Sequence, residues 1–368
     1  GMDSLSNYNG WRSDLGSANA QVSAEDFNDL APDQWSTRGP PRFSVETERF
    51  LDVIRMDRVQ GVFTGIGGVY RYRDAAPGLA LRGAVGYSWN ERTVRGRAIV
   101  ERRRDRTLTQ LRLTRSLDLT NDFRSPYDSG TTTGAFFGRD DYDYVDRRIA
   151  GLLVQRFLGV SQQGQVRVEL GFAQDRAVQA NWLESPVGLG APFRLNRPAD
   201  NGDYARGVLT LDWRPDVALE FLRTGAGSRI IYERGEGQLR YSRGEGRFTV
   251  RANRGKLALG ARLDVGAVTP TAPAQQYFEI GANNNLPGYD YKQFAGDQAA
   301  VLRGQVYRGF GILGAPIRIT SRIWWPPIAP GIAFNVQAGY TRASNAAARA
   351  TVLRLGSEPT GHVRSSAA

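Results

Sequence analysis

The sequence predicts an all-β chain that folds as a transmembrane antiparallel β-barrel. Three observations predict this class: apolar and polar side chains alternate strictly along many segments, the connections between these segments alternate between short and long, and arginines stand beside small residues on the polar face. No apolar run approaches the roughly 20 residues that a membrane-spanning helix needs. Spanning strands have a low average hydropathy, so the polar composition is compatible with a membrane protein.

The alternation identifies the individual strands. Between 257 and 267, for example, Leu259 and Leu263 oppose Arg262 and Asp264, which is a two-residue period that helical spacing does not fit. We expect about fourteen strands, and their predicted ranges are 59–73, 78–90, 93–104, 107–120, 142–157, 165–176, 204–214, 228–236, 238–243, 247–254, 257–267, 298–310, 317–324 and 332–342.

The connections and the polar face favour a membrane barrel over a soluble sandwich. Connections 91–92 and 105–106 are tight, whereas 121–141, 177–203 and 268–297 are long, as in outer-membrane barrels with short periplasmic turns and long external loops. In such a barrel the polar face lines the lumen. The expected lumenal charges are Arg82, Arg112, Arg167, Arg262, Arg303 and Arg322.

The N-terminal part of the chain differs from the rest. Residues 1–45 are polar and rich in turn formers, and we expect them to be a linker ahead of a barrel domain at 46–368. Residues 1–21 contain no apolar stretch typical of a signal peptide. Because an exported protein needs one and the chain opens on Gly-Met, the sequence favours a fragment.

The chain is organised around the stretch 281–307, in which a loop rich in Gly, Asn and aromatic residues leads into an alternating strand. A loop of some thirty residues that carries Tyr289 and Tyr291 would lose apolar burial outside the barrel, so we expect it to fold back into the lumen. There, Asp290 and Asp297 are expected to form ion pairs with Arg303 or Arg322, two of the lumenal charges.

The motifs in this chain resemble those of the bacterial surface antigen family, the outer-membrane barrels of the BamA/TamA and two-partner-secretion translocase superfamily. Segment 55–61 resembles that family's first barrel strand, and two parts of the loop resemble its sixth external loop, which folds into the barrel. The expected motif positions in this inward loop are Leu286, Pro287, Gly288, Tyr289, Gly296 and Asp297. The family's loop arginine, which contacts acidic groups on the inner wall, falls at Pro287, so this chain departs from the pattern there.

The resemblance implies a location in the bacterial outer membrane and a function in outer-membrane protein assembly or polypeptide translocation, without a cofactor. The implied partners are outer-membrane lipid, client polypeptides and periplasmic domains upstream. The family's barrel has sixteen strands, of which we expect about fourteen here, so the barrel is expected to be incomplete at the C-terminus. Two alternatives stay open: a passive, anion-preferring pore and a soluble basic all-β binding protein.

Composition limits other functions. The chain has no cysteine and a single histidine, so thiolate metal sites and most histidine-dependent catalysis are excluded, and we expect neither an enzyme nor a metal site. The net charge of +11 raises nucleic acid as a partner, but the arginine run 102–106 falls at a turn between strands, and we expect no nucleic acid there. The acidic run Asp140 to Asp143 is expected to be a solvated loop.

Overall fold

The computed structural model divides the chain into two compact units, 1–42 and 43–368. The division lies close to the predicted end of the linker at 45, because Phe43–Ser44 (β1) already pairs with the barrel sheet. The second unit contains every helix and strand of the described residues. The described residues are 42–47, 50–72, 76–120, 123, 140, 142–159, 163–182, 193–218, 223–281, 286, 288–310, 317–318, 324–325, 330–358 and 364–367.

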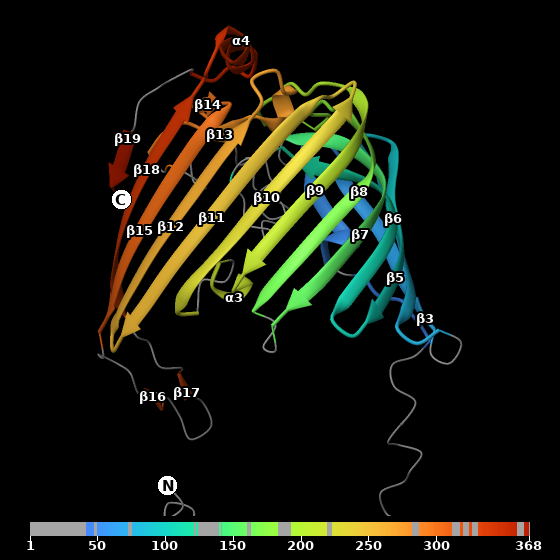
Figure 1. Ribbon diagram of the computed structural model, residues 1–368, viewed down its shortest axis with the longest axis horizontal. Coiled ribbons are helices and arrows are strands. Elements are labelled where there is room, and N and C mark those ends of the chain that lie inside the picture. Colours follow the sequence, from blue (N-terminus) through green and yellow to red (C-terminus); the bar gives the residue numbers. More distant parts are fainter. Residues whose placement is uncertain are drawn as a thin grey trace, which may run out of the picture. The chain divides into compact units, whose positions relative to one another are not determined.

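The second unit is built on one antiparallel sheet in which fifteen strands are described. Twelve of them are 10 to 15 residues long, and each pairs with the next of the twelve along the chain to form the curved wall in Figure 1. These long strands are β3 (Gly61–Arg71), β4 (Leu79–Ser88), β5 (Thr93–Arg104), β6 (Thr107–Leu119), β7 (Tyr144–Leu158), β8 (Gly164–Ala177), β9 (Gly202–Trp213), β10 (Gly225–Gly237), β11 (Tyr241–Arg254), β12 (Leu257–Val268), β15 (Gln298–Gly309) and β18 (Gly331–Arg342).

Short elements complete the unit. β1 and β2 (Ile54–Asp57) pair with β3, and β19 (Arg364–Ala367) pairs with β18. Two separate sheets each have two strands: β13 (Phe278–Ile280) with β14 (Phe294–Gly296), and β16 (Ile317–Arg318) with β17 (Trp324–Trp325). The short helices are η3 (Phe50–Asp52), α3 (Pro215–Ala218), η4 (Ala274–Gln276) and α4 (Ala346–Arg354). Among the described residues, no helix has the length and apolar character needed to cross a membrane.

The structure confirms the all-β antiparallel fold but corrects two predicted strands. The strands predicted at 238–243 and 247–254 are one strand, β11, which begins at Tyr241, because Gly244 and Gly246 stay paired with both β10 and β12. The two glycines therefore lie in a continuous ladder. The strand predicted at 317–324 is also wrong, since β16 and β17 pair with each other rather than with the barrel sheet.

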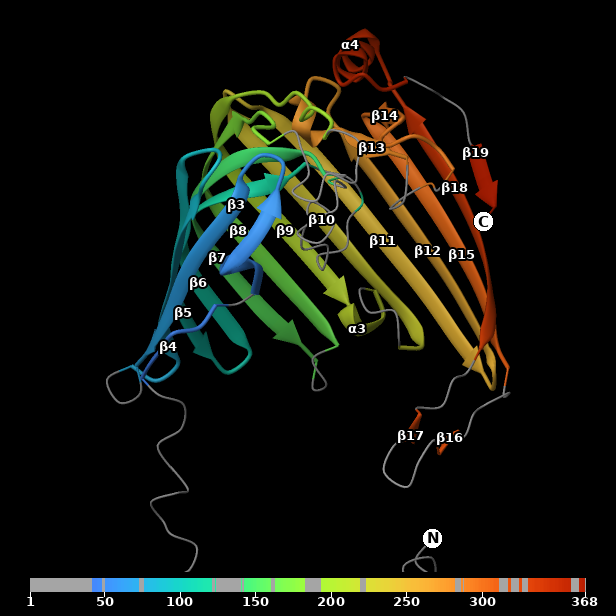
Figure 2. The ribbon, with the colours of Figure 1, turned by 180° about the vertical axis from the view of Figure 1, so that it is seen from behind.

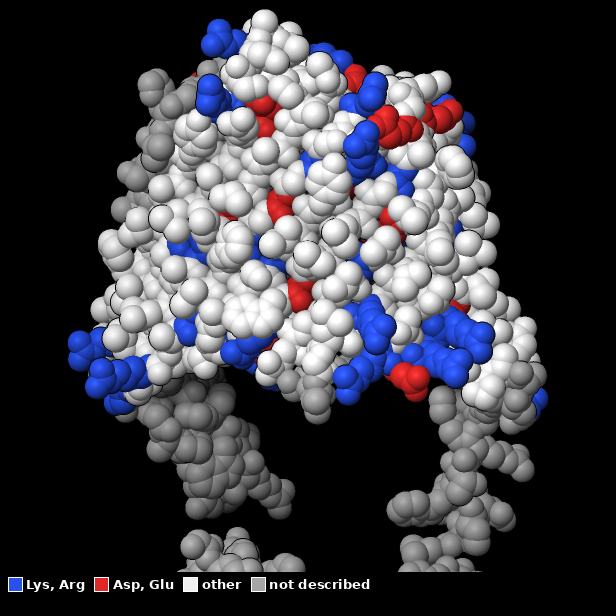
Figure 3. Space-filling model, viewed as in Figure 1, with Lys and Arg blue, Asp and Glu red and all other residues white. Residues whose placement is uncertain are grey.

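The outer face of the sheet is apolar. Each of the twelve long strands carries at least one large apolar side chain that is exposed, such as Leu113 (58%), Leu170 (58%) and Phe334 (56%), and Figure 3 shows few charges across the middle of this face. The inner face carries buried charges, such as Glu169 and Asp264. A soluble sandwich would bury its apolar face against a second sheet, whereas a membrane barrel presents that face to lipid. This arrangement favours the membrane barrel.

The connections differ between the two ends of the wall. The loop end, where α4 lies in Figures 1 and 2, carries the connections 120–143, 178–201 and 269–297. The loop end also carries the short connections 89–92 and 238–240, the first of which contains the tight turn predicted at 91–92. The turn end carries tight connections at 105–106 and 255–256, with 214–224 and 310–330 as longer exceptions. Trp89 and Trp213 are exposed near the loop end and the turn end respectively. Long external loops and short periplasmic turns place the turn end on the periplasmic side.

The outward face can be tested with an arginine substitution. Leu113 is the middle residue of β6 and faces outward between Ala98 and Ala150 of the adjacent strands. We expect Leu113→Arg to lower the free energy of unfolding by about 2–4 kcal/mol in a bilayer. The control is Gln110→Arg on the inner face, beside Glu101, whose carboxylate already accepts a hydrogen bond from the Gln110 amide. Equal losses in urea titrations of both variants would contradict the assignment of faces.

Candidate functional site

The connection 269–297 packs against the inner face of the wall. Its ends are joined by the pairing of β13 with β14, and the aromatic rings of Phe278 and Phe294 are buried, at 0% and 3% exposed. They belong to a hydrophobic core that also contains Val301 of β15 and Val352 of α4. Figure 2 shows β13 and β14 near the loop end of the wall, beside β15 and β18. This loop therefore contributes eight of the nineteen buried residues described in that core.

Two glycines on the inner face allow the loop to lie directly on the strands. A Cβ atom on Gly266 of β12 would lie 2.3 Å from the ring of Phe278, and one on Gly339 of β18 would lie 2.4 Å from Leu286. Real Cβ atoms do not approach other atoms so closely, so a larger residue at either position would push the loop off the wall. Leu286 itself is 1% exposed.

Lys292 joins this loop to the opposite side of the interior. Its side chain is 1% exposed, and its Nζ atom lies 2.7 Å from Glu279 Oε2, 3.0 Å from Asp143 Oδ2 and 3.1 Å from Thr120 Oγ1. Glu279 lies on β13, whereas Thr120 and Asp143 are at the two ends of the connection between β6 and β7. A buried charge is stable where partners of opposite charge and hydrogen bonds replace water, and Lys292 has both.

Asp143, just before β7, contacts cationic side chains from three other parts of the chain. Besides Lys292, its carboxylate contacts Arg58 Nη2 at 2.8 Å and Arg194 Nη1 at 2.6 Å. Burial alone raises the pKa of Asp143, but Lys292, Arg194 and Arg58 together outweigh burial and hold that pKa well below its usual range. Burial raises the pKa of Glu279, even though Lys292 also contacts it.

The expectation that the acidic run is solvated is wrong. Asp140 and Asp143 are 4% and 0% exposed, and Asp141 lies outside the described residues. Asp140 accepts a hydrogen bond at 2.9 Å from the backbone N–H of Arg58, in the turn between β2 and β3. The run was misread because its partners, Arg58 and Lys292, are distant in sequence.

The predicted inward-loop positions lie as follows. Leu286 is buried, Pro287 is outside the described residues, and Tyr289 is half-buried with its ring 5.4 Å from that of Phe294. Gly288 has a φ of +94°, a backbone region that favours glycine. A Cβ on Gly296 would lie 2.4 Å from the backbone oxygen of Arg342, so β14 approaches the end of β18 as closely as glycine allows.

The predicted ion pairs of this loop are not the ones observed. Asp297 is buried and accepts hydrogen bonds from the backbone N–H and the hydroxyl of Ser344, at 2.7 and 2.5 Å. Asp290 is exposed. Within the described part of the chain neither carboxylate forms an ion pair, and Arg322 lies outside that part. The cation that anchors the loop is Lys292, a residue of the loop itself.

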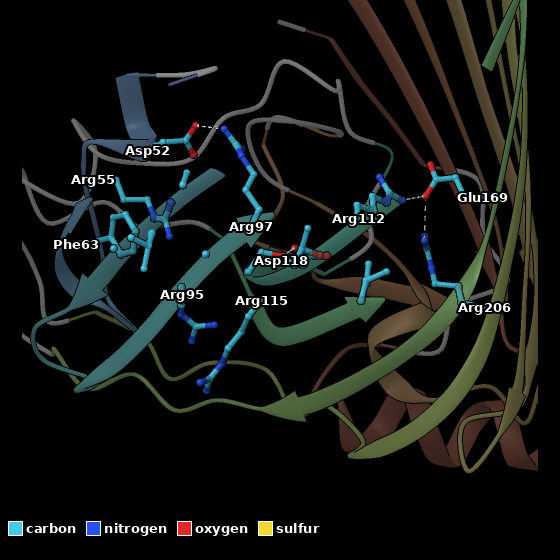
Figure 4. Close-up of a pocket in the computed structure, with 17 residues that line it drawn as sticks. Asp52, Arg55, Phe63, Arg95, Arg97, Arg112, Arg115, Asp118, Glu169 and Arg206 are labelled. Atoms are coloured by element: carbon cyan, nitrogen blue, oxygen red, sulfur yellow. Dashed lines mark hydrogen bonds and ion pairs between the residues drawn. The ribbon is translucent and has the colours of Figure 1, made fainter. Parts of the chain in front are cut away.

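The other arginines predicted to be lumenal lie on the inner face of their strands. Arg82 is 3.4 Å from Glu101, Arg167 is 3.1 Å from Glu169, and Arg262 is 2.7 Å from Asp264. Arg303 lines a cavity of about 230 Å³ near the turn end of β11, β12 and β15. Arg112 contacts Glu169, and Figure 4 shows both at a second cavity, of about 360 Å³.

This second cavity is polar but its charges are paired. Glu169 accepts contacts from both Arg112 and Arg206, and Arg97 donates to Asp52 at 2.8 Å, as Figure 4 shows. Among the described residues, no group of three or more His, Cys, Asp or Glu side chains is placed to hold a metal ion. What the interior offers chemically is a surface of guanidinium–carboxylate pairs that can bind polar groups of an extended chain.

Together these features define a transmembrane β-barrel that holds one of its own loops against its inner wall. Its fold is that of a BamA-type barrel: the chain superposes on BamA from Haemophilus ducreyi lacking POTRA domains 1–3 with a TM-score of 0.50 and 10% identity, over 92% of this chain and 70% of that chain. CdiB from Acinetobacter baumannii matches at 14% identity and a TM-score of 0.36, over 77% of this chain and 47% of that one. No family model and no curated protein sequence matches the chain.

The fold and the exposed apolar band agree on where the protein lies. A curved antiparallel sheet with an apolar outer face and a charged inner face has the pattern of side chains that β-strands show in a bilayer. The fold shared with the BamA barrel and the apolar outer face are together those of a transmembrane β-barrel protein. The apolar outer face described above does not favour the soluble alternative.

Lys292 can be tested against a matched lysine. The chain has two lysines, and the other, Lys256, is exposed in the turn between β11 and β12. We expect Lys292→Met to lower the free energy of unfolding by about 3–5 kcal/mol, because it removes the buried cation that the carboxylates of Asp143 and Glu279 share. Lys256→Met should change it by less than about 0.5 kcal/mol. Urea titrations followed by tryptophan fluorescence measure both, and a similar small effect at the two sites would contradict the buried contact.

Asp143 makes stability depend on pH in acid. Because its folded pKa lies below the unfolded value of about 3.9, its ionised form stabilises the fold above about pH 4, and this contribution is lost as the pH falls further. Asp143→Asn should therefore give a flatter stability profile between about pH 5 and pH 2 than the unmodified protein. Glu279, whose raised pKa acts in the opposite direction, is common to both proteins. Asp290→Asn, at an exposed position, is the control, and parallel profiles for all three proteins would refute the effect.

Proposed function

We propose that the chain is the membrane-spanning part of a protein that assembles proteins into the outer membrane or moves polypeptides across it. The observation that carries this proposal is the loop 269–297, which packs on the inner wall of a BamA-type fold and is anchored there by Lys292. A loop held by side-chain contacts, rather than by a ladder to the wall, can move without unfolding the barrel. Such a loop suits a passage that has to open for a client.

Lys292 is proposed to take the role of the loop arginine of the bacterial surface antigen family, which this chain resembles. The family's arginine contacts acidic groups inside the barrel, and here Lys292 contacts Asp143 and Glu279 although Pro287 occupies the expected motif position. An amine and a guanidinium both supply a buried positive charge to a carboxylate, but lysine does so as a point charge without the bidentate geometry of arginine. The loss of the motif arginine then does not remove the anchor.

The first long strand offers a place for a client strand. Among the described residues, the outer edge of β3 pairs with four residues of β2 and two of β1. Short partners at a strand edge can be replaced by a longer strand, which gains backbone hydrogen bonds along its whole length. Client polypeptides and upstream periplasmic domains are the partners that this function requires.

The proposal is tested by the folding of a client in liposomes. An unfolded outer-membrane barrel protein is added to liposomes that contain this chain, and its folding is followed by protection from protease. We expect faster folding than in empty liposomes, and a changed rate with Lys292→Met but not with Lys256→Met. Folding that is no faster than in liposomes containing an unrelated barrel of equal protein mass would refute an assembly function. A polypeptide that reaches the liposome interior only when the chain is present would support translocation instead.

A further inference from the structure

A set of outward-facing arginines marks the turn end of the barrel. They alternate in register with exposed apolar residues of the same strands, such as Val154 and Val306, and all are exposed. The set, called here the turn-end arginines, comprises Arg102, Arg104, Arg156, Arg254 and Arg308. None of them forms an ion pair with a carboxylate of the described residues. Figure 3 shows positive charge gathered along this end of the wall.

The register groups four of them into two similar pairs. Arg104 of β5 is opposite Thr107 of β6, which is opposite Arg156 of β7. In the same way, Leu257 of β12 lies between the other two, Arg254 and Arg308. Neighbouring strands are about 4.8 Å apart, so the two arginines of each pair start roughly 10 Å apart on the same face. Two long side chains at this spacing can converge on one phosphate group.

The position of the pairs identifies the depth at which they act. Arg156 is the next outward-facing residue after Val154, and Arg308 is the next after Val306. Each arginine lies about 6.7 Å further along its strand toward the turn end. The guanidinium groups therefore begin where the apolar band ends, and Trp213 is also exposed at this end. Tryptophan side chains favour the level of the lipid headgroups. Arginine at that level meets phosphate, which it binds through two hydrogen bonds at once.

The loop end provides the contrast. Most of its outward arginines have acidic partners: Arg176 lies 3.8 Å from Asp203, and Arg240 lies 3.2 Å from Glu236, which Arg234 also contacts. Arg148, which is also exposed at this end, is an exception. At the turn end, the outward positions of the described strands carry no Asp or Glu. The outward arginines without an acidic partner are thus concentrated at one end of the outer face, the end that faces the periplasmic leaflet.

We propose that the turn-end arginines bind the phosphate groups of anionic phospholipids in the periplasmic leaflet. A soluble acidic partner below the barrel would meet the tips of the turns, whereas Arg156 and Arg308 lie within β7 and β15, and Arg104 and Arg254 are the last strand residues before their turns. The two arginine pairs form two separate sites, each for one headgroup. Their charge would fix the depth of the barrel in the membrane, in addition to any role of the interior in moving polypeptides.

The test compares lipid binding by two variants with equal charge changes. One variant carries R104Q, R156Q, R254Q and R308Q; the control carries R148Q, R176Q, R234Q and R240Q on the outer face at the loop end. Each folded protein is given an equal mixture of phosphatidylglycerol and phosphatidylcholine in detergent, and the bound lipids are counted by native mass spectrometry. We expect the unmodified protein and the control to retain phosphatidylglycerol preferentially, and the turn-end variant to lose that preference about tenfold or more.

Two further experiments distinguish one arginine pair from the other, and lipid phosphate from free inorganic phosphate. R104Q with R156Q, and R254Q with R308Q, should each remove part of the preference. Inorganic phosphate, at the same ionic strength as a chloride control, should displace little of the lipid. The proposal is overturned if the turn-end variant keeps its preference, if the control loses it equally, or if inorganic phosphate displaces the lipid completely. All of these variants change exposed residues, and recovery of the folded protein is checked by its mobility on a gel before heating.

Discussion

The bilayer imposes the constraint on which this structure depends: within the hydrocarbon, each backbone N–H and C=O must find its partner in the protein. Ten of the twelve long strands meet it by pairing on both sides with other long strands, whereas the outer edges of β3 and β18 pair only with the short strands β1, β2 and β19. The same constraint sends every second side chain to lipid and every second one inward. Because the polar half cannot face the hydrocarbon, it gathers inside, where arginines such as Arg112 and Arg206 must share carboxylates such as Glu169.

The interior solves this charge problem in two ways. Near the middle of the wall, guanidinium groups and carboxylates on neighbouring strands neutralise each other, so the lumen stays polar with few isolated charges. Near the loop end, the connection 269–297 supplies an apolar filling and brings Lys292 with it. Lysine is rare in this chain, and its burial beside Asp143 and Glu279 is therefore a local solution rather than a result of composition.

Sequence reasoning predicted the class of fold, because a period of two is visible in any single strand such as β12. It failed where a local signal was ambiguous: the two strands predicted at 238–243 and 247–254 are one, because β10 and β12 hold Gly244 and Gly246 in register. It could not find Lys292 as an anchor, since Thr120, one of its partners, is 172 residues away in the chain. The acidic run was misjudged for the same reason, because a carboxylate looks solvated until its cations are known.

Asp143 receives side chains from the turn after β2, from the connection between β8 and β9, and from the loop between β12 and β15. The three cations come from separate parts of the curved wall. The ion pairs of Asp143 with Arg58, Arg194 and Lys292 therefore link these parts through the interior. These contacts hold the curvature of the sheet, although its edge strands β3 and β18 pair on their outer sides only with short strands. Moving the parts of the wall away from each other requires one of these ion pairs to break, and the released charge would then lose its partner inside the protein.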